Sequence, residues 1–141
     1  MDSIVDYVTV LSRKITDTRM ESELNYVPDI TINRYFRRIR KYTMPYLDIG
    51  AQEMEEIFVI QLCLLQKIDC SMVVSKGNAH IVSFISFLLI LKWTTDHSID
   101  LEYLSVVGGF RTSDICKWEV EILDIVDWII PLHFPSENAL S

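Results

Sequence analysis

The chain has 141 residues, a formal net charge of −7 and 50% hydrophobic residues. This length suits one domain with a single sizeable core, and a composition with only four glycines and four prolines excludes a disordered or fibrous chain. The acidic balance argues against non-specific nucleic-acid binding by the domain as a whole, although one short segment is strongly basic.

The three cysteines, Cys63, Cys70 and Cys116, form no CxxC pair and lie in apolar or helical stretches. This pattern predicts reduced thiols in the core rather than a metal site. The N-terminal stretch begins acidic and has no basic segment followed by an apolar run, so we expect no secretory signal. We therefore expect a cytoplasmic or nuclear protein that needs neither a metal nor another cofactor.

A first amphipathic helix is predicted over residues 2–17, because apolar residues recur there at spacings of four, three and four. These residues are Ile4, Val8, Leu11 and Ile15. Asp2 or Ser3 is the expected cap. The polar residues 18–29 are predicted to connect this helix to the next one.

A second helix is predicted to begin at its cap, Thr31, and to end at Pro45. Its apolar side comprises Ile32, Tyr35, Phe36, Ile39 and Tyr42, and its basic side comprises Arg34, Arg37, Arg40 and Lys41, with Arg38 at the border. The basic side is either a solvated surface or a docking surface for an acidic partner, formed by Arg34, Arg37 and Arg40. Nucleic acid is disfavoured because no aromatic side chains interleave on that side.

The apolar segment 78–96 is the centre of the predicted fold. It is shorter than the roughly 20 apolar residues of a membrane span, so we expect a core helix, capped by Asn78 and wrapped by its neighbours. Ser83 and Ser86 are small enough to let another helix approach closely. His80 is expected to be a hydrogen-bonded structural residue rather than a ligand.

Helices are also predicted on both sides of the central segment. One starts at Asp48 or Gly50 and runs to about Ile68, with carboxylates in its first turn, where they suit the helix dipole. A short helix over residues 100–107 ends where the chain can take positive φ, at Gly108 and Gly109. A last helix extends to residue 128 and is terminated with the help of Pro131; its expected caps are Thr112 or Ser113. No stretch predicts a strand.

Two charged residues lie in apolar surroundings. Glu119 has mainly apolar neighbours at three and four residues on either side, namely Ile115, Cys116, Ile122 and Leu123. An unpaired carboxylate there would cost several kcal/mol, so it needs a partner, and Lys92 is the natural candidate. The two residues form either an internal salt bridge or a polar binding site at the rim of an apolar patch.

The residues from Pro28 to Pro131 resemble the cyclin box, most closely that of the P-type or U-type cyclins associated with phosphate signalling. The matching segments are DITINRYFRRIRKYT, residues 78–96, VVGGF and WEVEIL, and the matching positions include Arg38, Lys41, Tyr42, His80, Lys92, Tyr103 and Glu119. Their order and ungapped spacing carry the resemblance.

The resemblance implies an all-α fold: a single five-helix cyclin box over residues 28–131 around a central buried helix. An N-terminal amphipathic helix and its connection, residues 1–27, precede it, and a short tail, residues 132–141, follows. It also implies a regulatory subunit rather than an enzyme, in a heterodimer with a cyclin-dependent kinase and without nucleic acid or membrane. The implied kinase contacts are Lys92, Trp93, Glu119, Leu123, Trp128 and Ile130, and the structural positions are Arg38, Gly108 and Gly109.

The sequence departs from the family at Gln66 and Lys67, where such cyclins usually have an aspartate and an arginine. A buried pairing of Arg38 with that aspartate therefore cannot form.

The alternative function is a cyclin-like helical adaptor that binds a protein without activating a kinase. An enzyme is disfavoured, because no catalytic or phosphate-binding motif is present.

Overall fold

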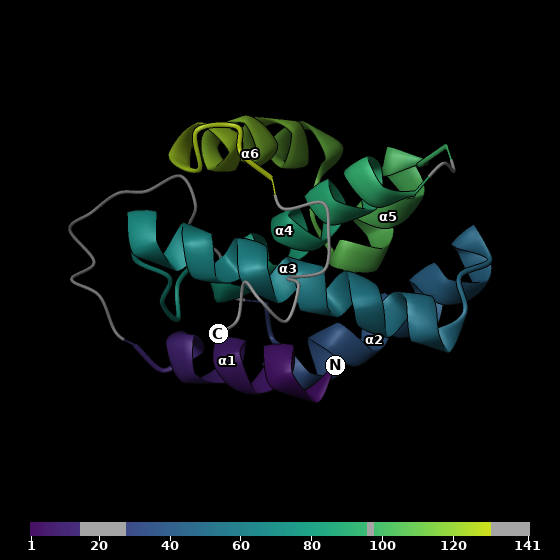
Figure 1. Ribbon diagram of the computed structural model, residues 1–141, viewed down its shortest axis with the longest axis horizontal. Coiled ribbons are helices and arrows are strands. Elements are labelled where there is room, and N and C mark those ends of the chain that lie inside the picture. Colours follow the sequence, from purple (N-terminus) through teal and green to yellow (C-terminus); the bar gives the residue numbers. More distant parts are fainter. Residues whose placement is uncertain (15–27, 96–97, 131–141) are drawn as a thin grey trace, which may run out of the picture.

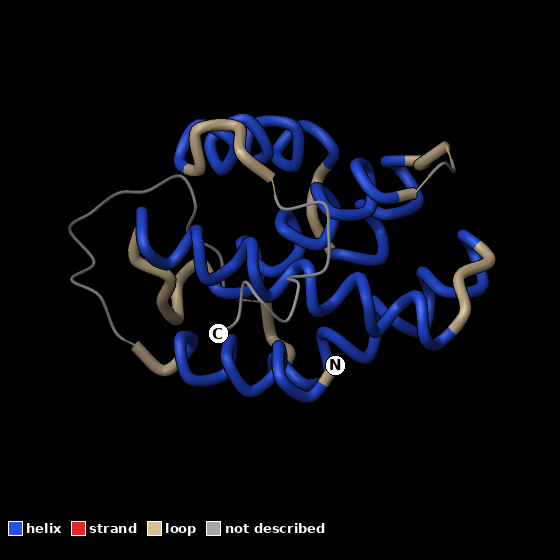
Figure 2. The backbone as a smooth tube through the Cα atoms, in the orientation of Figure 1, coloured by secondary structure: helices blue, strands red, loops and turns tan. Residues whose placement is uncertain are grey.

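The computed structural model describes residues 1–14, 28–95 and 98–130 (Figure 1). These residues form six α-helices and no strand, which confirms the all-α prediction (Figure 2). The helices are α1 (Asp2–Ser12), α2 (Ile32–Leu47), α3 (Ala51–Ser71), α4 (Ala79–Thr94), α5 (Leu101–Gly108) and α6 (Thr112–Ile125).

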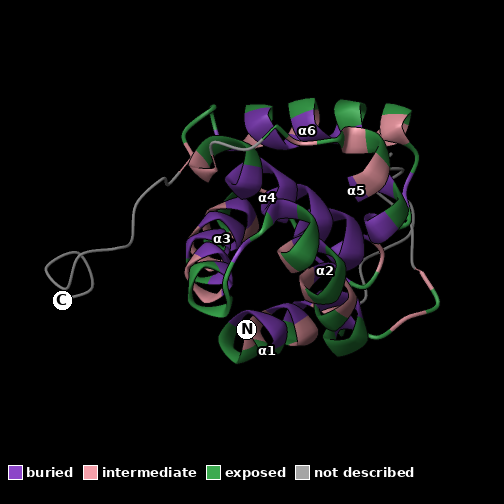
Figure 3. Ribbon diagram, turned by 90° about the vertical axis from the view of Figure 1, so that its right-hand side faces the viewer, coloured by how far each residue is buried: buried purple, intermediate pink, exposed green. Residues whose placement is uncertain are grey.

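Helix α4 is the core of the molecule. Every residue from 79 to 91 is buried, and α1, α3 and α6 pack against it. Figure 3 shows α6 along one side of α4 and α1 on the opposite side of the fold. A helix that is apolar all round has no face suited to water, so it becomes the centre on which amphipathic helices pack. Burial stops at Lys92 and Trp93, which are both exposed.

The packing of α3 on α4 depends on small polar residues. The buried Gln61 of α3 donates from Nε2 to the Ser83 carbonyl oxygen at 2.8 Å and to Ser86 Oγ at 3.0 Å. Beside this contact the rings of Phe58 and Phe87 stack with centroids 5.9 Å apart. The prediction that the two serines admit a close neighbour is confirmed, and that neighbour is α3.

The two glycines at the end of α5 serve different purposes. A side chain at Gly108 would lie 2.5 Å from the Phe84 ring, and the Gly108 carbonyl oxygen accepts a 2.6 Å hydrogen bond from the Tyr35 hydroxyl. Gly109 caps the helix with φ of 78°, a conformation that side chains disfavour. Gly108 is therefore required because a larger residue would collide with the Phe84 ring, and Gly109 because its backbone has positive φ.

The predicted boundary at Pro45 is wrong. Pro45 lies inside α2, which continues to Leu47 and ends at Asp48 in the left-handed region, with φ of 52°. Proline's φ matches that of a helix, and near the C-terminus the missing N–H costs a single hydrogen bond. Helix α3 follows from its N-cap, Gly50, and extends beyond the expected end to Ser71.

The predicted caps are only partly right. Thr31 accepts a hydrogen bond from the Arg34 amide, as expected. Asn78 occupies the N-cap position of α4, but its side chain accepts from the Ser75 amide and donates to the Val73 carbonyl instead. The caps expected on α1 and α6 are wrong, because Met1 and Arg111 occupy those N-cap positions.

Three further expectations differ from the structure. Helix α1 ends at Ser12 with Arg13 as its C-cap, earlier than expected, and only residues 15–17 of the expected range lie outside the described residues. Tyr42 is 45% exposed rather than part of the apolar side of α2. Cys70 and Cys116 are exposed and only Cys63 is partly buried, so the prediction of core thiols is wrong.

Among the described residues, no helix is long and apolar enough to cross a membrane.

Candidate partner-binding site

Lys92 and Glu119 form a two-pronged ion pair between the last turn of α4 and the middle of α6. Lys92 Nζ donates to both carboxylate oxygens of Glu119, at 2.9 Å to Oε1 and 2.8 Å to Oε2. The helical neighbours Ile115 and Ile122 point Glu119 toward α4, because they are fully buried on the same face of α6. The structure thus provides the partner that the apolar surroundings of Glu119 required.

The two members of this pair are unequally exposed to water. The Lys92 side chain is 36% exposed, whereas that of Glu119 is 12% exposed. Two of the three ammonium hydrogens are used by the carboxylate, which leaves Lys92 one donor directed elsewhere. The pair is therefore an internal salt bridge whose lysine end reaches the molecular surface.

Large apolar side chains are exposed at the end of α4 and after α6. Trp93 is 53% exposed, Trp128 is 57% exposed and Ile129 is 62% exposed, while Ile130 is partly buried. Leu123, expected among the contact residues, is only 6% exposed and belongs to the core. Exposed aromatic side chains are typical of a protein-binding surface, and Trp93 directly follows Lys92 in the chain.

The turn after α6 positions Trp128. Asp127 and Trp128 both have positive φ, 54° and 60°, and the Trp128 amide donates to the Leu123 carbonyl oxygen at 2.8 Å. The indole Nε1 donates to Asp124 Oδ1 at 2.9 Å. The helix therefore ends at Ile125, before the predicted residue 128, because these left-handed residues turn the chain back.

Lys67 and Ile129 contact each other and were not among the predicted contact residues. Lys67 Nζ of α3 donates to the Ile129 carbonyl oxygen at 3.1 Å and so ties the segment after α6 to the rest of the domain. Residues 67 and 129 are 62 positions apart, so no local pattern links them. The exposed side chain of Ile129 adds to the surface beside Trp128.

The three arginines of the expected docking surface have different environments. Arg34 and Arg37 are exposed, but Arg40 is partly buried. Arg40 Nε lies 3.9 Å from Glu55 Oε1, and Glu55 also pairs with the amino group of Met1.

Arg38 has a structural contact instead. Its Nη2 donates to the Val106 carbonyl oxygen at 2.9 Å and links α2 to α5. Gln66, at the position of the family's aspartate, is exposed.

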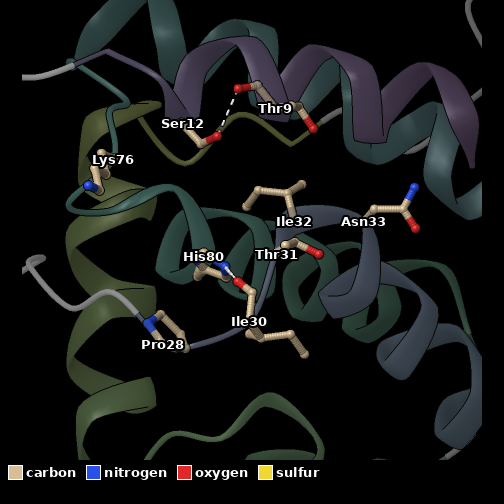
Figure 4. A pocket seen from close by; sticks show the side chains of 9 residues that line it. All are labelled: Thr9, Ser12, Pro28, Ile30, Thr31, Ile32, Asn33, Lys76 and His80. Atoms are coloured by element: carbon tan, nitrogen blue, oxygen red, sulfur yellow. Dashed lines mark hydrogen bonds between the residues drawn. The ribbon is translucent and has the colours of Figure 1, made fainter.

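A pocket of about 330 Å³ lies near the first turn of α4, between that turn, α1 and the start of α2 (Figure 4). His80 lines it, and its Nε2 donates to the Ile30 carbonyl oxygen at 2.7 Å. Burial lowers the pKa of His80 from 6.5, and the hydrogen bond to Ile30 opposes this only in part. The expected structural histidine is confirmed, and Lys92 lies twelve residues further along α4, away from the pocket.

No group of three or more metal-ligating side chains occurs among residues 1–14, 28–95 and 98–130. The site described here consists of an ion pair and exposed apolar side chains. Such an arrangement can bind another protein through hydrogen bonds and apolar contact, but it offers no nucleophile next to a general base. The described residues thus form an all-helical domain with an ion pair and large apolar side chains at its surface.

The family model described as Cyclin matches residues 8–130. The chain belongs to the cyclin family, whose members are regulatory rather than catalytic. The helices described above are accordingly those of a cyclin-box fold. No curated protein matches the sequence.

Proposed function

We propose that this protein binds a cyclin-dependent protein kinase as its regulatory subunit and activates it by packing on the kinase's C-helix. The Lys92–Glu119 pair and the exposed Trp93 and Trp128 form the contact surface. The resulting heterodimer acts in the cytoplasm or nucleus, in cell-cycle or nutrient-linked phosphorylation. Within the family, the protein belongs with the P-type or U-type cyclins.

The observation that carries this proposal is the ion pair itself. Glu119 holds the Lys92 ammonium group in place, with one N–H left to donate to a backbone carbonyl of the partner. A pair already formed in the free protein loses little side-chain entropy on binding. The carboxylate of Glu119 has lone pairs left to accept a hydrogen bond from the partner backbone.

The exposed tryptophans supply the apolar part of the contact. Tryptophan is enriched among the residues that contribute most to binding at protein interfaces, and burying these rings removes apolar surface from water. Holding the kinase C-helix inward lets the kinase's own lysine and glutamate pair around ATP. The activating step is therefore a shift of the kinase toward its active arrangement, with no chemistry on this chain.

The test is to mix the purified protein with purified cyclin-dependent kinase catalytic subunits and to measure both binding and phosphorylation of a peptide substrate. We expect one kinase to bind and to gain activity. Lys92→Ala and Glu119→Ala should weaken binding by about 2 to 5 kcal/mol, as truncation of a desolvated charged contact does. Lys76→Ala and Glu53→Ala, at exposed positions of the same residue types, are the matched controls.

Affinities are corrected for the folded fraction of each variant, because Lys92 and Glu119 also contribute to stability. Binding without a gain in kinase activity would identify the protein as an adaptor instead. If the corrected affinities of the Lys92 and Glu119 variants equal those of the controls, the ion pair is not part of the binding site.

A further inference from the structure

A second surface, independent of the kinase site, lies on α2. Arg34, Arg37, Arg38 and Lys41 recur at spacings of three, one and three, which places them on one face of the helix. We call them the basic stripe. Arg34, Arg37 and Lys41 are exposed and Arg38 is partly exposed. Helix α2 contains no carboxylate, in a chain whose net charge is −7.

The charge of the basic stripe is not balanced within the described residues. Ion pairs join Met1 and Arg40 to Glu55 and Lys92 to Glu119, and none of these involves a residue of the stripe. One hydrogen bond, from Arg38 to the Val106 carbonyl oxygen, ties the stripe to the rest of the fold. Several like charges held side by side on one face attract an anionic partner.

An aromatic cluster continues the basic stripe toward the C-terminus of α2. Tyr42 is 45% exposed and Tyr46 is 39% exposed. The Tyr46 ring stacks on Tyr103 of α5, with centroids 4.0 Å apart, and the Tyr103 hydroxyl donates to the Tyr42 carbonyl oxygen at 2.9 Å. Lys41 Nζ lies 5.4 Å from the centre of the Tyr42 ring. These contacts hold rigid rings next to the cations.

We propose that the basic stripe and the aromatic cluster bind an extended acidic segment of a partner protein, with carboxylates along the stripe and an apolar residue against the tyrosines. Arg34 and Arg37 belonged to the docking surface expected from sequence. The structure adds Arg38, Lys41 and the tyrosines, and it removes Arg40, which lies next to Glu55.

The spacing of the cations favours carboxylates over a single phosphate. Arg34 and Lys41 are seven residues apart, about 10.5 Å along the helix axis. An extended peptide covers this length with about three or four residues, so two carboxylates on alternate residues can each meet a guanidinium group. A single phosphate would require cations that converge on one point rather than follow the helix.

The test measures binding of fluorescein-labelled peptides to the free domain by anisotropy, so its result does not depend on the kinase proposal. The probe is a peptide of about ten residues, long enough to cover the stripe, with alternating glutamate and serine followed by leucine and proline. We expect saturable binding that weakens at least tenfold between about 0.05 and 0.3 M NaCl, because salt screens exposed charges.

Variants of the protein assign the contacts. Replacing Arg34, Arg37 and Lys41 together by Gln should weaken binding at least tenfold and flatten its salt dependence. The matched control replaces Arg13, Lys76 and Arg111 by Gln; these residues are exposed, and the net charge changes equally. Tyr42→Ser should weaken binding severalfold while the salt dependence stays as in the wild type.

Three outcomes would overturn the proposal. The first is equal loss of binding in the stripe variant and its control, since binding would then follow overall charge. The second is equal affinity for a peptide in which glutamine replaces glutamate. The third is tighter binding of a singly phosphorylated glutamine peptide or of single-stranded oligothymidylate than of the acidic peptide at equal salt.

Discussion

Lys92 and Glu119 are bonded to each other yet differ in their access to water, and this difference predicts unequal effects of removing either charge. Lys92→Met leaves a carboxylate that is 12% exposed without its partner, and should cost about 1 to 3 kcal/mol of unfolding free energy. Glu119→Gln leaves an ammonium group that is 36% exposed and still has an amide oxygen as acceptor, and should cost less than about 1 kcal/mol.

Urea denaturation of both single variants and the double variant measures this difference. The double variant should be less destabilised than the two single effects predict together, because no orphaned carboxylate remains. Equal costs for the two single substitutions would show that Glu119 is hydrated more freely than its position in the structure indicates.

His80 makes the stability of the fold depend on pH. Burial lowers its pKa below the ordinary 6.5, so the unfolded chain binds a proton at a higher pH than the folded chain does. The stability that the neutral ring contributes is therefore complete above pH 6.5 and is lost as the pH falls through the folded-state pKa. Nδ1 is buried with no partner among the described residues, and a proton there would be an unsatisfied donor.

His80→Gln removes the titration and keeps a side-chain N–H that can donate to Ile30. We expect the wild type to lose more unfolding free energy than this variant between about pH 7 and pH 5. Denaturant titrations at several pH values measure the two slopes. Identical slopes would mean that His80 contributes nothing to the pH dependence in this range.

At the scale of the helices, α4 carries the fold because its whole circumference is buried. Leu88 has no exposed surface. Leu88→Asp places a carboxylate in the core without a partner, at a cost of several kcal/mol against a total stability of about 5 to 15 kcal/mol. We expect loss of the cooperative thermal transition followed by circular dichroism.

The control for this substitution is Val106→Asp, because Val106 is 72% exposed on α5. It introduces the same carboxylate at the surface and should retain a cooperative transition close to that of the wild type. A Leu88→Asp protein that melts like this control would contradict the central position of α4.

For the molecule as a whole, the three tryptophans report on the proposed interface. Trp93 and Trp128 are more than half exposed, whereas Trp118 is 7% exposed and its ring contacts Phe110. Acrylamide should therefore quench most of the emission of the free protein. Replacing Trp93 and Trp128 by Phe should leave a blue-shifted emission that acrylamide quenches poorly.

The same fluorescence should respond to a partner at the kinase site. Binding of the kinase should protect the wild-type emission from acrylamide, because the exposed indoles become buried, while the emission of Trp118 should be unchanged. A complex in which Trp93 and Trp128 remain as accessible as in the free protein would place the interface elsewhere on the molecule.

Local patterns in the sequence were sufficient to predict much of the fold. The all-apolar circumference of α4 predicted its central position, and the two-sided pattern of α2 predicted the burial of Phe36 and Ile39. The Thr31 cap and the two glycines ending α5 were also predictable. Helical periodicity, capping and backbone conformation depend on residues within a few positions of one another, so the sequence displays them directly.

Only the tertiary structure determined which residues from different helices and loops contact one another. Apolar neighbours showed that Glu119 needs a partner, but only the crossing of α4 and α6 brings Lys92 Nζ to 2.8 Å from its carboxylate. Likewise, the side chain of Asn78 binds the preceding loop instead of capping α4, and Lys67 reaches the Ile129 carbonyl oxygen. These contacts depend on how helices pack, a long-range outcome of burying apolar surface that spacing along the chain does not contain.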